Sequence, residues 1–244
     1  MTKTHPPATL PPGQRRIDFF PRFGRRVGQP PPPVPAHPTV VFGGALTAPI
    51  EIAVDELVGT DRLELRADFH CVAGWSVTGL VWEGVAFADV YQRYVAPAVV
   101  PGTIVTHVMV RGLDGEHFVA ELEDLLAELE DLLADDVLLA DRLGGRPLDG
   151  AHGAPLRLVN PAQYGYANIK HVCRIDVLAD APAAGSPALL DRLLQSHPRA
   201  RVWEEERHGT LPGWLIRPIY RLIKAVMLSA AARHSESGHQ SNAK

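Results

Sequence analysis

Cys71 stands where a run of alternating apolar residues ends and a glycine-containing loop begins. Positions 63, 65, 67 and 69 are apolar and the positions between them are polar, which predicts a strand with one buried face. A cysteine in this place is either a small buried hydrophobe or a thiolate that serves as a nucleophile or a soft metal ligand. The pattern alone leaves these interpretations open.

Cys173, the other cysteine, has a different setting. It alternates with His171, Ile175 and Val177 along an apolar run, so we expect it in the core, on the buried face of a strand. Two cysteines in 244 residues do not make a disulfide scaffold, because a chain of this length builds a core of its own. We therefore expect reduced thiols and a cytoplasmic protein.

Arg157 and Lys170 each interrupt apolar surroundings that are typical of strands. An unpaired charge is costly to bury, so each side chain needs a counter-charge. A salt bridge within the protein would supply it, and so would a phosphate or pyrophosphate group, to which a guanidinium binds well in bidentate fashion. Both interpretations stay open from the residues alone.

The spacing of other residues argues against several kinds of site. No Cys-x-x-Cys, His-x-x-x-His or His-Glu-x-x-His occurs, so a zinc site built from protein ligands alone is not expected. The glycine patterns of nucleotide-binding loops and the Gly-x-Ser-x-Gly elbow of serine hydrolases are missing as well. The formal charge of -4, from 24 basic and 28 acidic side chains, gives no basic excess for nucleic acid.

The elements that must position these residues belong to one mixed, strand-rich α+β domain. Short apolar strands separated by turn residues fill residues 39–179. We expect a proline-rich arm at 1–38, an extension with helices at 180–233 and a disordered tail at 234–244. No arginine pair of the arm precedes an apolar run and no stretch of about 18 apolar residues occurs, so we expect neither an export signal nor a transmembrane segment.

Two helical patterns flank the predicted site. Residues 121–127 and 128–134 repeat the heptapeptide Glu-Leu-Glu-Asp-Leu-Leu-Ala, which predicts a lengthened surface helix, with a partner-binding helix as the alternative. Near the C-terminus, Leu215, Ile219 and Leu222 recur at helical spacing with cations between them. We expect this amphipathic helix to dock on its own domain, and peripheral contact with a membrane surface or a protein partner is the alternative.

Several of these segments together resemble a known family. They resemble the molybdopterin-binding domain of sulfite-oxidase-like oxidoreductases, of the small bacterial type without a haem domain. The resemblance covers residues 39–179 and extends through 203–208 and 211–214. It rests on Phe69-His-Cys71-Val-Ala-Gly-Trp75-Ser, Trp82-Glu-Gly84, His152-Gly-Ala-Pro-Leu-Arg157-Leu-Val and Tyr164-Gly165 to Lys170. The resemblance implies the fold of that domain and a molybdenum-molybdopterin cofactor.

The resemblance also implies roles for individual residues. In the family a cysteine thiolate binds molybdenum beside the pterin dithiolene, which implies that role for Cys71, since a soft thiolate suits a metal already held by sulfur. The arm near Phe23 and Gly24 would close over the pterin. In the methionine-sulfoxide-reducing branch the cofactor is held at the positions of His152, Arg157, Asn168, Ile169 and Lys170, with asparagine in the place of His152.

The chain departs from true sulfite oxidases directly after the cysteine. Those enzymes have arginines there that hold the sulfite anion, whereas residues 72–76 of this chain carry no charge. We therefore expect a two-electron redox or oxygen-atom-transfer reaction on a small substrate that is sulfoxide-like rather than sulfite. No haem or iron-sulfur ligand set occurs, so an external electron-transfer partner is expected.

Two alternatives of other classes remain. A metal-free hydrolase or transferase could use the Cys71 thiolate with His70 or His107 as its base. A non-catalytic binding protein could keep the same fold and use the duplicated helix and the C-terminal helix as interaction surfaces.

Deleting residues 128–134 should leave cofactor content and turnover unchanged. Seven residues at about 3.6 per turn return the leucine stripe to nearly the same face of the helix, so the deletion removes two turns in register. Molybdenum content, pterin content and turnover are measured on the deletion variant beside the full chain. Loss of cofactor or of folding would contradict the peripheral role of the repeat.

Overall fold

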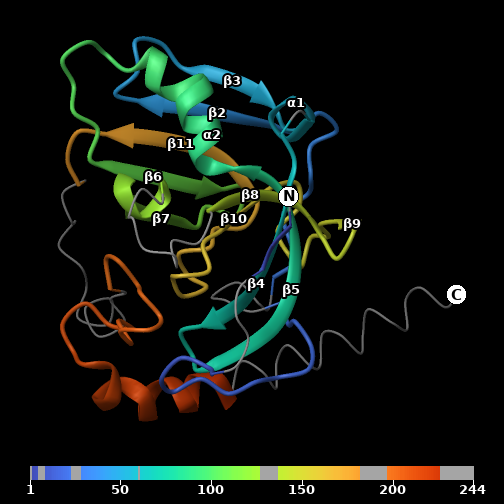
Figure 1. Ribbon diagram of the computed structural model, residues 1–244, viewed down its shortest axis with the longest axis vertical. Helices are drawn as coiled ribbons and strands as arrows, with labels where there is room; N and C mark the ends of the chain where they lie inside the picture. The colour runs from blue at the N-terminus through green and yellow to red at the C-terminus, as the bar shows by residue number, and fades with distance from the viewer. Residues whose placement is uncertain are drawn as a thin grey trace, which may run out of the picture.

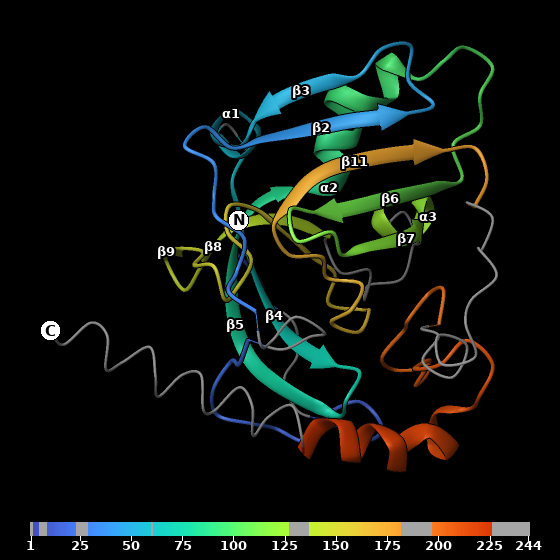
Figure 2. The same cartoon turned by 180° about the vertical axis from the view of Figure 1, so that it is seen from behind.

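The computed structural model describes residues 2–4, 9–22, 29–59, 61–126, 137–181 and 197–225. Over these residues the chain forms two β-sheets and short helices, which confirms the predicted α+β class (Figures 1 and 2). The domain limits at 38, 179 and 233 stay predictions. The predicted tail and most of the duplicated heptapeptide lie outside the described residues.

The first sheet carries both Cys71 and Arg157. Its strand order is β1-β4-β5-β8-β10, with β9 paired to β8. The strands are β1 Thr2–Thr4, β4 Leu63–Cys71, β5 Trp75–Ala86, β8 Leu138–Leu143, β9 Arg146–Pro147 and β10 Arg157–Val159. β4 and β5 form a long antiparallel hairpin whose far end extends beyond the second sheet (Figure 1).

The second sheet has the order β3-β2-β11-β6-β7. Its strands are β2 Thr39–Gly44, β3 Ile50–Ala53, β6 His107–Gly112, β7 His117–Glu121 and β11 Val172–Leu178. The helical segments are α1 Val54–Gly59, α2 Phe87–Val90, a π-helical turn Tyr91–Val95, a 3-10 turn Ala96–Ala98, α3 Leu122–Leu126 and a C-terminal helix at 213–225.

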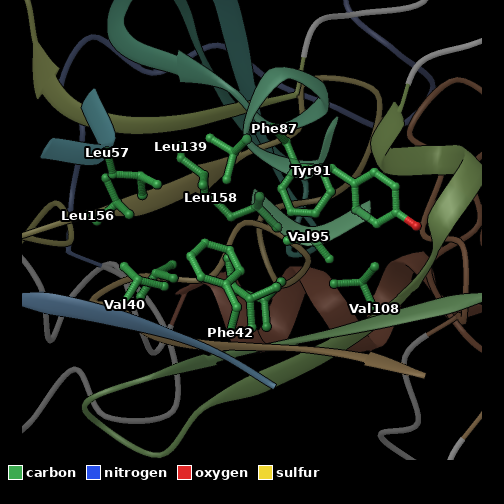
Figure 3. Close-up of a cluster of buried hydrophobic side chains, with 14 of the residues drawn as sticks. Val40, Phe42, Leu57, Phe87, Tyr91, Val95, Val108, Leu139, Leu156 and Leu158 are labelled. Carbon is green, nitrogen blue, oxygen red and sulfur yellow. The ribbon is translucent and has the colours of Figure 1, made fainter. Parts of the chain in front are cut away.

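Apolar side chains from both sheets meet in one large core (Figure 3). Val40 and Phe42 of β2 face Leu139 of β8 and Leu158 of β10, and all four are buried. Phe87 of α2 joins the same cluster. Removing this apolar surface from water is the main favourable contribution to folding. The core therefore anchors β8 and β10, and through β8 it anchors the β4–β5 hairpin.

The turn that follows Cys71 is shorter than the sequence suggests. The pattern predicts a loop through Trp75, but β5 begins at Trp75, which pairs with Cys71 across the hairpin, so this prediction is wrong. Gly74 adopts φ +88 and its N–H donates to the Cys71 carbonyl at 2.9 Å, which closes the turn within three residues. Cys71 is consequently fixed at the end of a strand ladder.

The prediction that Cys173 lies in the core is wrong. The register of β11 against β6 shifts between Val172 and Arg174, and such an irregularity interrupts the alternation of strand faces. Val172 and Ile175 are buried, whereas Cys173 is only partly buried.

The spacing of Phe87, Val90, Tyr91 and Tyr94 predicts a helix over residues 85–94, but the helical structure begins later and is irregular. Val85 and Ala86 still pair with β8 as the last residues of β5. The chain then forms α2, followed by the π-helical turn and the 3-10 turn that contains Pro97. A proline has no N–H to donate, which suits a place where the regular helix has ended.

The N-terminal arm packs on the hairpin through Phe20 rather than Phe19. The Ser76 N–H donates to the Arg15 carbonyl at 2.9 Å, so the arm lies alongside the start of β5. The ring centroids of Phe20 and Phe69 are 4.9 Å apart, whereas Phe19 is 51% exposed. The arm is therefore part of the wall around the end of β4.

The C-terminal helix docks with a different face from the one predicted. Ile216 and Tyr220 are buried, and the Tyr220 hydroxyl donates to the Arg207 carbonyl at 3.2 Å. Tyr220 is suited to this place because its ring is apolar and its hydroxyl reaches a polar partner. The predicted docking of Leu215, Ile219 and Leu222 is wrong, since all three are exposed. Peripheral contact through this helix stays a prediction.

Membrane crossing by a helix finds no support in the part of the chain that the structure describes. None of the helices there combines sufficient length with sufficient apolar character to span a bilayer.

Phe42→Ala should lower the free energy of unfolding by about 3–5 kcal/mol, because it leaves a cavity in the centre of the core. Phe19→Ala is the matched control at an exposed position, with an expected change below about 0.5 kcal/mol. Chemical denaturation of both variants measures the difference. Equal losses would show that the core is not where the structure puts it.

Candidate molybdopterin site

Cys71 is the last residue of β4 and its side chain is 5% exposed. It packs in one cluster with Phe69, Ala73 and Trp75. Burial raises the pKa of the Cys71 thiol to about 12, although a backbone hydrogen bond at Ala73 and the charge of Lys170 act in the opposite direction. The free thiol is therefore protonated at neutral pH, and a thiolate requires a metal or another strong electrophile to replace the proton.

Arg157, the first residue of β10, is fully buried in an aromatic cage. Its Cζ atom lies 5.1 Å from the ring centroid of Phe69, 5.2 Å from that of Trp82 and 5.5 Å from that of Phe20. Nη1 donates to the His152 carbonyl at 2.9 Å. Among the described residues, Nε and Nη2 have no hydrogen-bond partner. Burial lowers the pKa of Arg157 to about 9.

Lys170 lies beside Arg157. A Cβ built on Gly153 would lie 3.2 Å from the Cβ of Lys170 and 3.3 Å from that of Arg157, so both residues flank the same glycine. Burial, followed by repulsion from Arg157 and Arg22, lowers the pKa of Lys170 to about 7. The charges of Asp114 and Cys71 act in the opposite direction. A buried arginine and a partly buried lysine side by side form an environment that favours an anionic ligand.

The remaining predicted site residues contribute mainly to the fold. Both ring nitrogens of His152 have protein partners, with Nδ1 at 2.8 Å from Asp149 and Nε2 at 3.1 Å from the Phe20 carbonyl. The Asn168 side chain makes hydrogen bonds to backbone groups, including the Asn160 N–H at 2.8 Å. Ile169 is buried in the main core. Phe23 and Gly24 lie outside the described residues.

Two residues that the sequence patterns miss hold the Cys71 turn in place. Gln14 of the arm donates from Nε2 to the Cys71 carbonyl at 3.1 Å. Arg207 donates to the carbonyls of Val72 and Pro12 at 3.2 Å each. The family resemblance includes the segment 203–208, which contains Arg207. No periodicity in that segment predicts that the arginine is buried.

Neither histidine proposed as a base for a thiol enzyme is suitably placed. His70 adjoins Cys71 on β4, so its side chain points to the opposite face of the strand. Its Nδ1 lies 2.8 Å from the Ser76 hydroxyl, which donates to Gln14. His107 begins β6 in the second sheet, where its Nδ1 contacts Thr106 at 2.8 Å.

The donor set fits a sulfur-bound anionic group better than a protein-only metal site. Within the described ranges no group of three or more His, Cys, Asp or Glu side chains could hold a metal ion. One buried thiol with two cations nearby, one of them Arg157 with two unused donors, fits a metal that arrives with its own sulfur ligands and an anionic tail.

The family comparison agrees with this fit. A family described as the oxidoreductase molybdopterin binding domain matches residues 29–185. The chain belongs to this family. The predicted resemblance to sulfite-oxidase-like oxidoreductases and the class of cofactor are thereby confirmed.

Individual relatives resemble parts of the chain. The catalytic subunit of the protein-methionine-sulfoxide reductase MsrP from Xanthomonas axonopodis pv. citri is 31% identical over an alignment of 159 residues, and the match covers 59% of this chain and 46% of that protein. The uncharacterized oxidoreductase YuiH from Bacillus subtilis is 28% identical over 164 residues, covering 67% of this chain and 74% of YuiH. The chain spans about half the length of the MsrP relatives that it matches.

A solved structure shares the fold. The sulfane dehydrogenase SoxCD from Paracoccus pantotrophus matches with a TM-score of 0.50 and 19% identity, over 68% of this chain and 44% of that chain. At this identity the likeness concerns the fold alone.

Arg157→Met should lower cofactor content without lowering the stability of the cofactor-free protein. Replacing a buried, incompletely bonded charge by an apolar side chain is neutral or stabilises by about 1–4 kcal/mol. The control is Arg207→Met, which should cost about 2–5 kcal/mol because its guanidinium bonds two backbone carbonyls. Thermal denaturation and pterin content of both variants are measured. A clear loss of stability in cofactor-free Arg157→Met would make Arg157 a structural residue.

Proposed function

We propose that this chain is a molybdopterin-dependent oxidoreductase that reduces a sulfoxide-type substrate, with Cys71 as the protein ligand to molybdenum. The observation that carries the proposal is the buried Arg157, which lies beside Lys170. Its Nε and Nη2 have no hydrogen-bond partner among the described residues. Such a guanidinium requires an anion, and a cofactor phosphate would supply it.

Each residue would have a distinct role. The Cys71 thiol would release its proton to solvent when the metal binds, and the thiolate sulfur would then hold the metal. Arg157 and Lys170 would bind the anionic end of the cofactor, and Lys170 would be protonated there because an adjacent anion favours the charged amine. Gln14 and Arg207 would keep the Cys71 turn fixed. When bound, the cofactor supplies the two-electron redox couple.

A sulfoxide-type substrate has two supports. The MsrP relatives are named as methionine-sulfoxide reductases. The turn that follows Cys71 carries no charged side chain of its own, unlike the turn expected of a sulfite oxidase. In the proposed reaction the sulfoxide oxygen leaves as water, and the reaction consumes two electrons and two protons for each sulfide formed. An external electron-transfer protein would supply the electrons, and we retain a cytoplasmic location as part of the proposal.

Cys71→Ser should lose at least about 100-fold in turnover while it keeps much of the pterin. A serine hydroxyl is a harder donor than a thiol and is less readily deprotonated, and the pterin would still be held at Arg157 and Lys170. The matched control is Cys173→Ser, which should stay active because Cys173 lies in the other sheet.

The measurements are pterin fluorescence, molybdenum content and reduction of a small sulfoxide by a reduced dye, on both variants side by side. Undiminished turnover by Cys71→Ser would overturn the ligand role. A covalent substrate adduct on Cys71 in metal-free protein would instead favour the thiol-enzyme alternative.

A further inference from the structure

A second cationic site lies next to the Cys71 turn. It is a pocket of about 80 Å³, which is enough space for several waters or one small oxyanion. Its walls come from three parts of the chain: the arm, the turn after Cys71 and the C-terminal segment. The lining residues are Gly13, Gln14, Arg15, Ala73, Gly74, Arg207, Arg217, Arg221 and Lys224. Cys71 does not line the pocket, so the pocket is adjacent to the proposed metal site without being part of it.

Three cations of this pocket have no counter-charge among the residues that the structure describes. Arg15, Arg221 and Lys224 make no ion pair with any described residue. Burial, followed by repulsion from Arg15 and Arg221, lowers the pKa of Lys224. Like charges gathered in one pocket raise the free energy of the folded chain unless an anion is present.

The one nearby carboxylate, among the described residues, is already engaged. Glu205 receives hydrogen bonds from Nε and Nη2 of Arg217, and its Oε1 lies 3.7 Å from Nε of Arg207. Arg207 is 1% exposed, and its Nε has no hydrogen-bond partner among the described residues. Glu205 is therefore shared between Arg217 and Arg207, and Arg15, Arg221 and Lys224 have no ion-pair partner among the described residues.

Two glycines of the lining bring the backbone close to the arginine side chains. Gly13 adopts φ +72, and a Cβ there would lie 2.5 Å from Nη2 of Arg207 and 3.1 Å from Nε of Arg217. Gly74, at φ +88, approaches Nη1 of Arg207 on the other side. Both glycines therefore let the chain pass close to the guanidinium groups without a side chain that would fill the space.

We propose that this pocket is a binding site for a dianionic tetrahedral oxyanion of the phosphate or sulfate type. Arg15, Arg221 and Lys224 carry more uncompensated charge than one carboxylate would offset, and guanidinium groups bind such oxyanions in bidentate fashion. The bound ion links the arm, the turn after Cys71 and the C-terminal helix.

The cations of this pocket lie outside the residues that the family model matches, although Ala73 and Gly74 of the matched part also line it. Its cations come from residues 15 and 207–224, whereas the family match covers residues 29–185. It is also separate from the cations proposed to hold the cofactor, since neither Arg157 nor Lys170 lines it. The proposal therefore does not depend on the redox activity.

The test is isothermal titration of the full chain with inorganic phosphate at constant ionic strength, with chloride as the balancing anion. The wild-type chain should show saturable binding at one site. Arg221→Gln/Lys224→Gln should bind roughly tenfold or more weakly, because two charge-assisted contacts are removed. The matched control, Arg66→Gln/Arg93→Gln, removes the same charge from exposed positions elsewhere and should bind as the wild type does.

Three results would overturn the proposal. Equal weakening by the control pair would mean a general effect of net charge. Loss of phosphate binding in Lys170→Met, with binding intact in Arg221→Gln/Lys224→Gln, would place the ion at the cofactor site. Acetate binding as tightly as phosphate would contradict a site for a dianion. Unchanged phosphate binding in Lys170→Met supports a separate site.

Discussion

The burial of the Arg157 guanidinium is the constraint on which the surrounding structure depends. Three aromatic side chains cover it, one from the arm and two from the β4–β5 hairpin, and the described residues leave two of its nitrogens without partners. Such an arrangement does not stabilise the fold, because a buried charge without a full set of partners lowers the free energy of unfolding by about 3–5 kcal/mol. Gly153 then brings Lys170 against Arg157, which adds repulsion. The proposed cofactor phosphate would offset both the desolvation of Arg157 and its repulsion from Lys170.

The hairpin that ends at Cys71 depends on residues far from it in the sequence. Gln14 bonds the Cys71 carbonyl, and Arg207 bonds the carbonyl of Val72 while it also bonds the arm at Pro12. Three carbonyls of the turn and the arm thus accept hydrogen bonds from side chains that are distant in the sequence. Since the turn closes within three residues, a shift in either the arm or the C-terminal segment would move the cysteine directly.

Local patterns in the sequence predicted the parts of the structure that local physics determines. The apolar alternation before Cys71 became β4, and Arg157 and Lys170, which the sequence sets in apolar surroundings, have pKa values that burial lowers, whereas their binding of an anion stays a prediction. Arg207 could not be found in this way, because its partners lie 135 and 195 residues away. The prediction that Cys173 is buried failed because a single register shift in β11 changes the face on which a residue lies. No feature of the sequence marks that shift.

The surroundings of Cys71 distinguish a ligand from a nucleophile. A catalytic thiolate needs a lowered pKa and a base within reach. Here burial raises the pKa to about 12, and the neighbouring His70 points to the other face of β4, toward Ser76. The raised pKa and the orientation of His70 make Cys71 unsuitable as a nucleophile. Neither feature opposes binding to a metal, because the metal displaces the thiol proton. The charges of Lys170, Arg207 and Lys224 lower the pKa of the thiol in part, so they also favour the thiolate that a metal would bind. In the proposed function, Lys170 would therefore favour both the Cys71 thiolate and the anionic end of the cofactor.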